Sequence, residues 1–438
     1  MKKITMLALT AGIALISLAS VVWTLNIKGD PDVSTPVAVA APSDALLARG
    51  AYLARAGNCM TCHTARGGAS YAGGRAIDTP FGAVFTSNLT PDERTGIGSW
   101  SSAHFWRAMH NGRSKSGRLL YPAFPYTSYT QVTREDSDAL FAYLGSLSAV
   151  VQPNRAHELR FPYQSQAALA IWRAMYFKPG EYVPDPQRNA EWNRGAYLVK
   201  GLGHCSACHT ARNALGASTG GLDLAGGLIP MQNWYAPSLT SPHEAGMGEF
   251  KREDIERLLK TGLSAGTGSS ASETVTVTGP MAEVVLNSTQ YLSPEDLTAM
   301  AQYLKELPAL RPQPVPTPAA VPFISAATAA RGAKIYEQQC AQCHGDTGQG
   351  VPNAYPALAG NRAVTMKQTV NLVQIVLNGG YAPATEGNPR PYGMPPFVLT
   401  LDDTDVAAVL THLRSAWGNQ ASVVTPLEVN RIRANSGQ

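Results

Sequence analysis

The sequence predicts an all-α protein in which three tandem repeats of one unit follow an N-terminal hydrophobic helix. A short segment recurs three times, and each copy is followed later by a helix start signal and an apolar helical face. Few stretches alternate apolar and polar residues in the manner of half-buried strands. The length of 438 residues agrees with this organisation, because about 150 residues per domain suggests roughly three domains.

The N-terminal segment is long enough to cross a membrane. Lys2 and Lys3 precede an uncharged stretch of 24 residues from Ile4 to Ile27. As a helix this stretch would span about 36 Å, which exceeds the roughly 30 Å of a bilayer core. The positive charges before it place the rest of the chain outside the cytoplasm. A retained anchor and a signal cleaved after Ala38–Ala40 are both open readings, and both export the protein.

Each repeat begins with the same segment. Apolar residues follow an Arg-Gly pair at the third and fourth positions after the Gly, which is the spacing of one helix face. The segments are Arg49–Leu53 before Cys59–His63, Arg194–Leu198 before Cys205–His209, and Arg331–Ile335 before Cys340–His344. A short amphipathic helix is therefore expected to lead into every Cys-x-x-Cys-His motif.

Each repeat is also expected to close with a helix. The start signals are Thr133 with Asp136, Ser293 with Pro294 and Asp296, and Thr400 with Asp403. Behind each signal, apolar residues recur at the spacing of one helix face. We expect each closing helix to pack against the leading helix of its own repeat, with Gly50, Gly195 or Gly332 permitting close approach.

These patterns set the expected boundaries. A signal or membrane anchor occupies 1–28, repeats occupy 45–150, 190–308 and 325–417, a connecting segment occupies 151–189, a Pro-rich linker occupies 309–324, and a tail occupies 418–438. The linker should be extended and semi-rigid because it is rich in proline. The connecting segment contains one expected helix, around Gln166 to Tyr176.

Composition narrows the class of protein. Hydrophobic residues make up 44% of the chain, which is enough to form hydrophobic cores and excludes disorder as the dominant state. Charged residues are only 15% and the net charge is +4, so no nucleic acid partner is expected. A surface of low charge instead fits a membrane or other protein subunits as partners.

All six cysteines lie in the three Cys-x-x-Cys-His motifs. Two thiols one helical turn apart can form thioethers with the two vinyl groups of heme, and the adjacent His can bind the iron. Zinc would need four ligands at each site, and disulfides or redox pairs are possible in an exported chain, but the His after every pair favours heme. The sequence thus predicts three heme c groups, bound by Cys59, Cys62 and His63, by Cys205, Cys208 and His209, and by Cys340, Cys343 and His344.

The sixth iron ligand must come from elsewhere in each repeat. Met394 and Met281 lie at corresponding places between the last two helices of their repeats, and a thioether ligand raises the reduction potential of heme. Phe124 stands at that place in the first repeat. The first heme is therefore expected to have an open or weakly ligated iron, with Met109 and His110 as the nearest substitute ligands.

Five further segments are distinctive: Leu120–Tyr126, Glu191–Val199, Gly201–Cys205, Asn233–Leu239 and Tyr355–Asn361. On these segments and the three motifs, the chain resembles the triheme cytochrome c subunits of membrane-bound dehydrogenases of Gram-negative bacteria, which oxidise alcohols, gluconate, sorbitol, fructose or aldehydes. The resemblance implies three class I cytochrome c domains on the periplasmic side of the inner membrane. It also implies electron transfer from a catalytic subunit holding pyrroloquinoline quinone (PQQ), FAD or a molybdenum cofactor to ubiquinone. Many members of this family carry Met where this chain has Phe124.

Three functions are compatible with these features. The first is a non-catalytic electron-transfer subunit of a respiratory dehydrogenase. The second is a peroxidase-like multiheme enzyme that uses an open iron at the first heme, and the third is a heme-bearing scaffold for subunit assembly. Met281 and Met394 favour electron transfer, because an iron with two axial protein ligands is closed to substrate.

Overall fold

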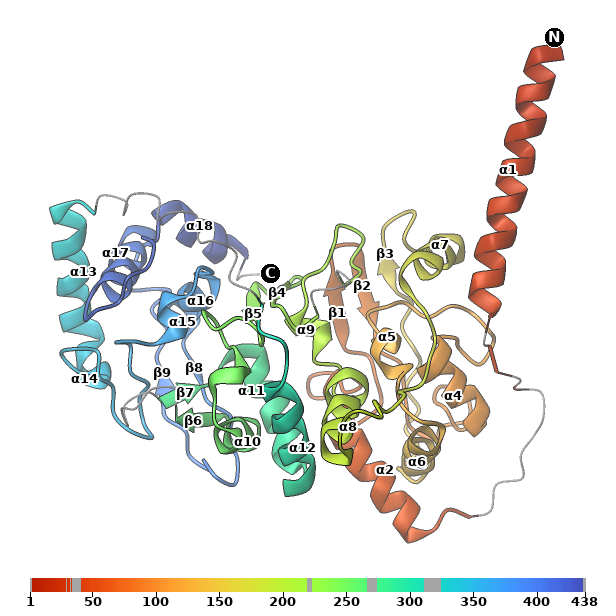
Figure 1. The fold of residues 1–438 in the computed structure, drawn as a ribbon, viewed down its shortest axis with the longest axis horizontal. Coiled ribbons are helices and arrows are strands. Elements are labelled where there is room, and N and C mark those ends of the chain that lie inside the picture. The colour runs from red at the N-terminus through yellow and green to blue at the C-terminus, as the bar shows by residue number, and fades with distance from the viewer. Residues whose placement is uncertain are drawn as a thin grey trace. The chain divides into compact units, whose positions relative to one another are not determined.

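A computed structural model describes residues 2–28, 30–31, 33, 41–218, 223–265, 274–310 and 324–435. The chain divides into two compact units (Figure 1). Compact unit 1 comprises Met1–Pro184, Lys200–His204 and Ala214–Ala217, and compact unit 2 comprises Asp185–Val199, Cys205–Asn213 and Ser218–Gln438. The predicted Pro-rich linker at 309–324 lies mostly outside the described residues.

Compact unit 1 holds the apolar N-terminal helix and the first repeat. Its elements are α1 (Lys2–Ile27), α2 (Asp44–Ala56), α3 (Cys59–Cys62), β1 (Ala76–Thr79), β2 (Gly82–Phe85), α4 (Ser102–Asn111), α5 (Tyr126–Tyr129), α6 (Arg134–Gly145), β3 (Glu158–Leu159) and α7 (Gln166–Tyr176). The three strands form one antiparallel sheet in the order β1-β2-β3. The helix predicted in the connecting segment is confirmed, because α7 has the predicted bounds.

Compact unit 2 contains the second and third motifs. Its elements, with one π-helical turn (η1) whose residues are divided between the two units, are α8 (Ala190–Tyr197), η1 (Leu198–Leu202), α9 (Ser206–His209), β4 (Gly227–Ile229), β5 (Trp234–Ala236), η2 (Met247–Glu249), α10 (Arg252–Thr261), β6 (Leu263–Ala265), β7 (Thr274–Thr276), α11 (Gly279–Asn287), η3 (Thr289–Tyr291), α12 (Pro294–Lys305), α13 (Ala326–Gln339), α14 (Ala341–His344), α15 (Arg362–Thr365), α16 (Val370–Asn378), β8 (Gly380–Tyr381), β9 (Gly393–Met394), α17 (Asp403–Ser415) and α18 (Pro426–Asn435). The strands pair in antiparallel twos, β4 with β5, β6 with β7 and β8 with β9.

Helices dominate both compact units, as the sequence predicts, but the short strands differ from an all-α expectation. Each strand has only two to four residues. A strand of this length carries too few residues for an alternating apolar pattern to stand out. The strands therefore cannot be recognised from the spacing of apolar residues in the sequence.

The leading helix of each repeat packs against its closing helix, which confirms the predicted pairing. The pairs are α2 with α6, α8 with α12, and α13 with α17. A glycine lies at each contact, where an added Cβ would overlap a backbone oxygen of the facing helix. The overlapping pairs are Gly50 with Ala139, Gly195 with Ala299, and Gly332 with Ala408. Only glycine allows the two backbones to come this close.

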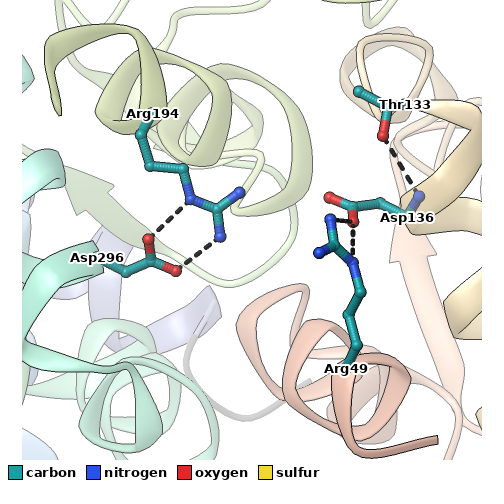
Figure 2. A network of polar contacts seen from close by, with 5 residues as sticks. All are labelled: Arg49, Thr133, Asp136, Arg194 and Asp296. Atoms are coloured by element: carbon teal, nitrogen blue, oxygen red, sulfur yellow. Dashed lines mark hydrogen bonds and ion pairs between the residues drawn. The ribbon is translucent and has the colours of Figure 1, made fainter. Parts of the chain in front are cut away.

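An ion pair accompanies each of these helix contacts. The Arg before the glycine bonds an acidic residue in the first turn of the closing helix, and Figure 2 shows the pairs of the first and second repeats. The Nε–Oδ1 distances are 2.8 Å for Arg49–Asp136, 2.7 Å for Arg194–Asp296 and 2.8 Å for Arg331–Asp405. The backbone N–H of each of these acidic residues also donates a hydrogen bond to the N-cap side chain of its helix. The same residue therefore stabilises the start of the closing helix and binds the Arg of the leading helix.

Two of the three predicted helix starts are confirmed, and the third is wrong by two residues. Thr133 and Ser293 cap α6 and α12 as predicted. The N-cap of α17 is Asp402, whose side chain accepts a hydrogen bond from the Asp405 N–H at 2.7 Å. Thr400 instead donates its hydroxyl to a carbonyl oxygen of the preceding turn. Helix α17 starts two residues after Thr400 because Asp402 and Asp405 each accept a hydrogen bond from the other's backbone N–H in a reciprocal capping box.

The second and third repeats pack together within compact unit 2. The Asn371 side chain on α16 bonds both backbone groups of Tyr235 on β5, accepting from its N–H at 2.8 Å and donating to its carbonyl at 2.7 Å. The Gln374 amide donates to the Asn233 carbonyl at 3.1 Å. These bonds use the backbone of the distinctive segment Asn233–Leu239, so that segment joins the two repeats.

The residues after 417 contribute to a core. Helix α18 packs against α16 and α17. Val424 and Val429 are buried in the hydrophobic cluster that also contains Val406 and Leu410 of α17. The segment set apart above as a tail therefore completes the core around the third motif.

Candidate heme-binding sites

The two cysteines of each motif lie one helical turn apart. In the first motif both cysteines lie in α3, whereas Cys205 and Cys340 are the N-cap residues of α9 and α14, which contain the second cysteine. None of the six cysteines forms a disulfide. This spacing places two thiols on the same side of one turn, which is what attachment of both heme vinyl groups requires.

Each motif histidine is held by a backbone carbonyl further along the chain. The Nδ1 distances are 2.7 Å from His63 to the Ser87 oxygen, 2.7 Å from His209 to the Pro237 oxygen, and 3.0 Å from His344 to the Pro356 oxygen. Since a carbonyl oxygen can only accept, Nδ1 must carry the proton and donate it. The Nε2 lone pair of each ring is then available for iron, as is usual for ligand histidines with a second hydrogen bond.

Burial also favours the neutral form of the three motif histidines. It lowers the pKa of His63, His209 and His344, in each case because the charged imidazolium loses solvation. The rings are therefore neutral at pH 7, and a neutral imidazole is the form that binds a metal.

Burial favours the protonated thiol over the thiolate at the first cysteine of each motif. Burial raises the pKa of Cys59 and Cys205 to about 12 and that of Cys340 to about 11. Zinc is bound by thiolates, which such surroundings disfavour. Within the described residues, no group of three or more His, Cys, Asp and Glu side chains could hold a metal ion. The donor sets thus fit heme, which brings four ligands of its own to the iron, and not a protein-only zinc site.

The three candidate positions for the sixth ligand share one feature of the chain that precedes them. Phe124, Met281 and Met394 each follow a helix that ends at a glycine with positive φ, and all three side chains are half-buried. These glycines are Gly112 after α4 (φ 57°), Gly262 after α10 (φ 76°) and Gly379 after α16 (φ 63°). This shared feature is consistent with the alignment of Phe124 with the two methionines, which stays a prediction.

The expected loop setting of the methionines needs correction. Met281 lies in the first turn of α11, and Met394 is the last residue of β9. Pro280 at the start of α11 is pre-organised for a helix, so the chain turns helical immediately before Met281. Both methionines stay proposed ligands.

The two substitute ligands suggested for the first heme have other contacts. Met109 is only 5% exposed and belongs to the buried face of α4. His110 stacks on Trp106, with ring centroids 4.5 Å apart, and its Nδ1 lies 2.8 Å from the Thr130 oxygen. The Phe124 ring packs against Tyr129 at 5.3 Å. These contacts favour a packing role for Met109, and an open or weakly ligated iron stays the prediction for the first repeat.

Comparison with known proteins agrees with this geometry. The family described as Cytochrome c matches residues 47–148 and 329–417, in the first and third repeats. The chain is 38% identical over 403 residues to the cytochrome c subunit of alcohol dehydrogenase (quinone) from Gluconacetobacter polyoxogenes, which covers 89% of this chain and 84% of that protein. It is 37% identical over 406 residues to the gluconate 2-dehydrogenase cytochrome c subunit from Pantoea cypripedii, covering 89% and 90%. The chain belongs to the family of dehydrogenase cytochrome c subunits.

One relative in this family is much longer. A subunit of nicotinate dehydrogenase from Pseudomonas putida is 41% identical over 413 residues, which cover 92% of this chain but 33% of that protein. This dehydrogenase cytochrome c subunit therefore spans about a third of the length of that relative. The family assignment confirms the resemblance drawn from the motifs, and it confirms heme c as the type of cofactor.

The structure adds site residues that the motifs do not reveal. The carbonyls of Ser87, Pro237 and Pro356 orient the three histidines, and a backbone oxygen has no residue-type signature. The distinctive segments Asn233–Leu239 and Tyr355–Asn361 contain two of these positions, which is the one sequence signal that could have pointed to them. In this cytochrome c subunit, Trp234 also packs so closely against Gly279 that an added Cβ would lie 2.9 Å from its ring, next to the turn that carries Met281.

Proposed function

We propose that this member of the family holds three heme c groups, one in each repeat, and carries electrons from a catalytic dehydrogenase subunit to ubiquinone. The three repeats then correspond to class I cytochrome c domains at 45–150, 190–308 and 325–417. The observation that supports this most directly is the threefold recurrence of a Cys-x-x-Cys turn followed by a neutral His whose Nδ1 is held by a carbonyl. A single instance could be structural, but three instances in one chain fit a series of redox centres.

The residues divide the work at each site. The cysteine thiols would attach the heme and the His Nε2 would bind its iron, while the carbonyl at Nδ1 fixes the ring orientation and would raise the basicity of Nε2. Met281 and Met394 supply thioether sulfur at the second and third sites. When bound, heme would supply one-electron redox chemistry, and burial together with the His and Met side chains would tune its potential.

The names of the relatives bear on the partners of this chain. Relatives in the family are named as cytochrome c subunits of alcohol dehydrogenase (quinone), gluconate 2-dehydrogenase and fructose dehydrogenase. These names support a dehydrogenase catalytic subunit as the partner. We further propose, as the family resemblance implies, that this subunit is of the PQQ, FAD or molybdenum type and that ubiquinone accepts the electrons.

The same proposal places the chain on the periplasmic side of the inner membrane. Among the described residues, one helix is long and apolar enough to span a bilayer, namely Lys3–Ile27 with a mean hydropathy of 2.1. The two lysines before it favour a cytoplasmic N-terminus. We assign α1 as a retained anchor, so that the repeats lie outside the cytoplasm.

Electron transfer is tested by purifying the solubilised full chain together with its co-purifying catalytic subunit. Substrate of that subunit should reduce the hemes, and a soluble ubiquinone analogue should reoxidise them. Hemes that stay oxidised under substrate would contradict the proposal. Rapid turnover of hydrogen peroxide by the isolated chain would instead support the peroxidase-like alternative, which Phe124 at the first site keeps open.

Replacing either proposed methionine ligand should lower one heme potential. In Met281→Gln and Met394→Gln a carboxamide oxygen replaces the thioether, and we expect a fall on the order of 0.1 V within the roughly 0.8 V range that axial ligands span. Spectroelectrochemical titration of the full chain measures the shift. Met175→Gln is the matched control, because Met175 is 54% exposed on α7 and should leave all potentials unchanged. Unchanged midpoints in either ligand variant would return that methionine to a packing role.

A further inference from the structure

Polar contacts fix the end of α1 to the rest of compact unit 1. The Asn26 amide donates to the Ala170 carbonyl at 2.9 Å, and the Arg173 Nε donates to the Asn26 Oδ1 at 3.0 Å. Arg113 donates to the Asn26 carbonyl at 2.8 Å and lies 3.6 Å from the Asp30 carboxylate. Asn26 is 8% exposed and Arg173 is 4% exposed. Removing α1 would leave the Nε of the buried Arg173 without its Asn26 acceptor, which is costly, so α1 belongs to the folded protein.

Helix α7 lies beside the base of α1 and presents apolar side chains to the outside. The two helices are in contact, and Figure 1 shows α1 projecting from compact unit 1 next to α7. Ala167, Ile171 and Met175 follow one another at intervals of four residues and are all exposed, which makes one helix face. Ile171 is 50% exposed and Met175 is 54% exposed, while Leu169 faces inward at 7%. Phe161, in the turn before α7, is 83% exposed.

We propose that this face of α7, with Phe161, lies in the boundary between headgroups and acyl chains of the bilayer that α1 crosses. The inference rests on the proposed role of α1 as a retained anchor. An apolar helix face fixed at the end of a membrane-spanning helix is continuous with the lipid-facing surface of that helix. Burying Ile171, Met175 and Phe161 in this boundary removes apolar surface from water, as in other interfacial helices.

The flanking residues of α7 suit the same boundary. Trp172 and Tyr176 form an aromatic pair with ring centroids 5.6 Å apart, and such residues concentrate where a membrane meets water. Lys178, just after α7, and Lys28, just after α1, are both exposed and can contact anionic headgroups. Anionic headgroups account for a lysine at the end of each helix, whereas binding of a protein partner does not require one at both ends. The two charges therefore favour lipid over protein as what covers this face.

Photo-cross-linking of the full chain in vesicles tests this surface. p-Benzoylphenylalanine replaces Ile171 or Met175, one at a time, in chain reconstituted into phosphatidylethanolamine and phosphatidylglycerol vesicles. Leu15, exposed within α1, is the positive control position, and Glu135, exposed on α6, is the negative one. Mass spectrometry should find lipid adducts at Ile171 and Met175 several-fold more often than at Glu135. An unchanged heme spectrum verifies that each variant is folded, and two positions keep the test valid if one variant misfolds.

The control positions distinguish the proposed membrane contact of α7 from the proposed anchor role of α1. Adducts at Leu15 with none above the Glu135 level at Ile171 and Met175 would overturn the α7 inference and leave the anchor in place. Absence of lipid adducts at all positions, Leu15 included, would overturn both. Adducts from Ile171 or Met175 to another protein, or to a second copy of the chain, in place of lipid would assign α7 to a protein interface and overturn the inference.

Discussion

Gly50→Ala is expected to destabilise the first repeat by about 3 kcal/mol or more, because overpacking at a backbone contact has no flexible side chain to absorb it. The new Cβ would overlap the carbonyl oxygen of Ala139 and crowd the Cβ of Tyr143 at 2.6 Å. Relief would require α2 and α6 to move apart, which would also stretch the Arg49–Asp136 ion pair. Denaturant unfolding followed by circular dichroism measures the shift in midpoint.

Gly145→Ala is the matched control. Gly145 is the last residue of α6, the same helix that Gly50 contacts, and nothing lies within 4 Å of an added Cβ there. Alanine is a better helix former than glycine, so this variant should be unchanged or more stable by up to about 1 kcal/mol. Equal unfolding midpoints for the two variants would show that the close helix contact is not what the glycine provides.

Phe124→Met is expected to abolish carbon monoxide binding by the reduced protein and to raise the potential of one heme. Phenylalanine offers iron no ligand atom, whereas methionine is flexible enough to fill the same half-buried space with sulfur. The wild-type chain should therefore bind carbon monoxide at one of its hemes. Absorption spectra of the reduced full chain with and without carbon monoxide measure the effect.

Phe124→Leu is the control for this change, because leucine is apolar and lacks sulfur. It should keep carbon monoxide binding, although the contact with the Tyr129 ring is lost. A wild-type protein that ignores carbon monoxide when reduced would contradict the open or weakly ligated iron. In that case, loss of low-spin character in Met109→Ala or in His110→Ala would identify the substitute ligand.

Much of the helical framework could be predicted from local signals. The bounds of α7, the caps at Thr133 and Ser293, and the three glycine contacts follow from short-range patterns of apolar spacing and start signals. The start of α17 could not be placed correctly, because Thr400 and Asp402 both offer a capping oxygen and only the fold decides between them. The pairing of β6 with β7 and of β8 with β9 could not be predicted, because strands of two or three residues carry no periodic signal.

The candidate sites also contain residues that the sequence predicts and residues that it does not. The cysteines and histidines are recognisable because heme attachment demands fixed residue types at fixed spacing. The carbonyls that hold His63, His209 and His344 have no residue-type signature, since every residue has a carbonyl and only the fold brings the right one near. The joining of the second and third repeats by Asn371 was likewise not predictable, because an exposed amide and a bonded one look alike in a sequence.

The central claim is that all three motifs carry covalent heme, and intact mass spectrometry of the mature full chain tests it most directly. We predict a polypeptide mass increased by three heme groups, with none of the six cysteines open to alkylation after denaturation, because every thiol is consumed in a thioether. A mass corresponding to two hemes or fewer, or any heme that extracts into acidified organic solvent, would contradict it.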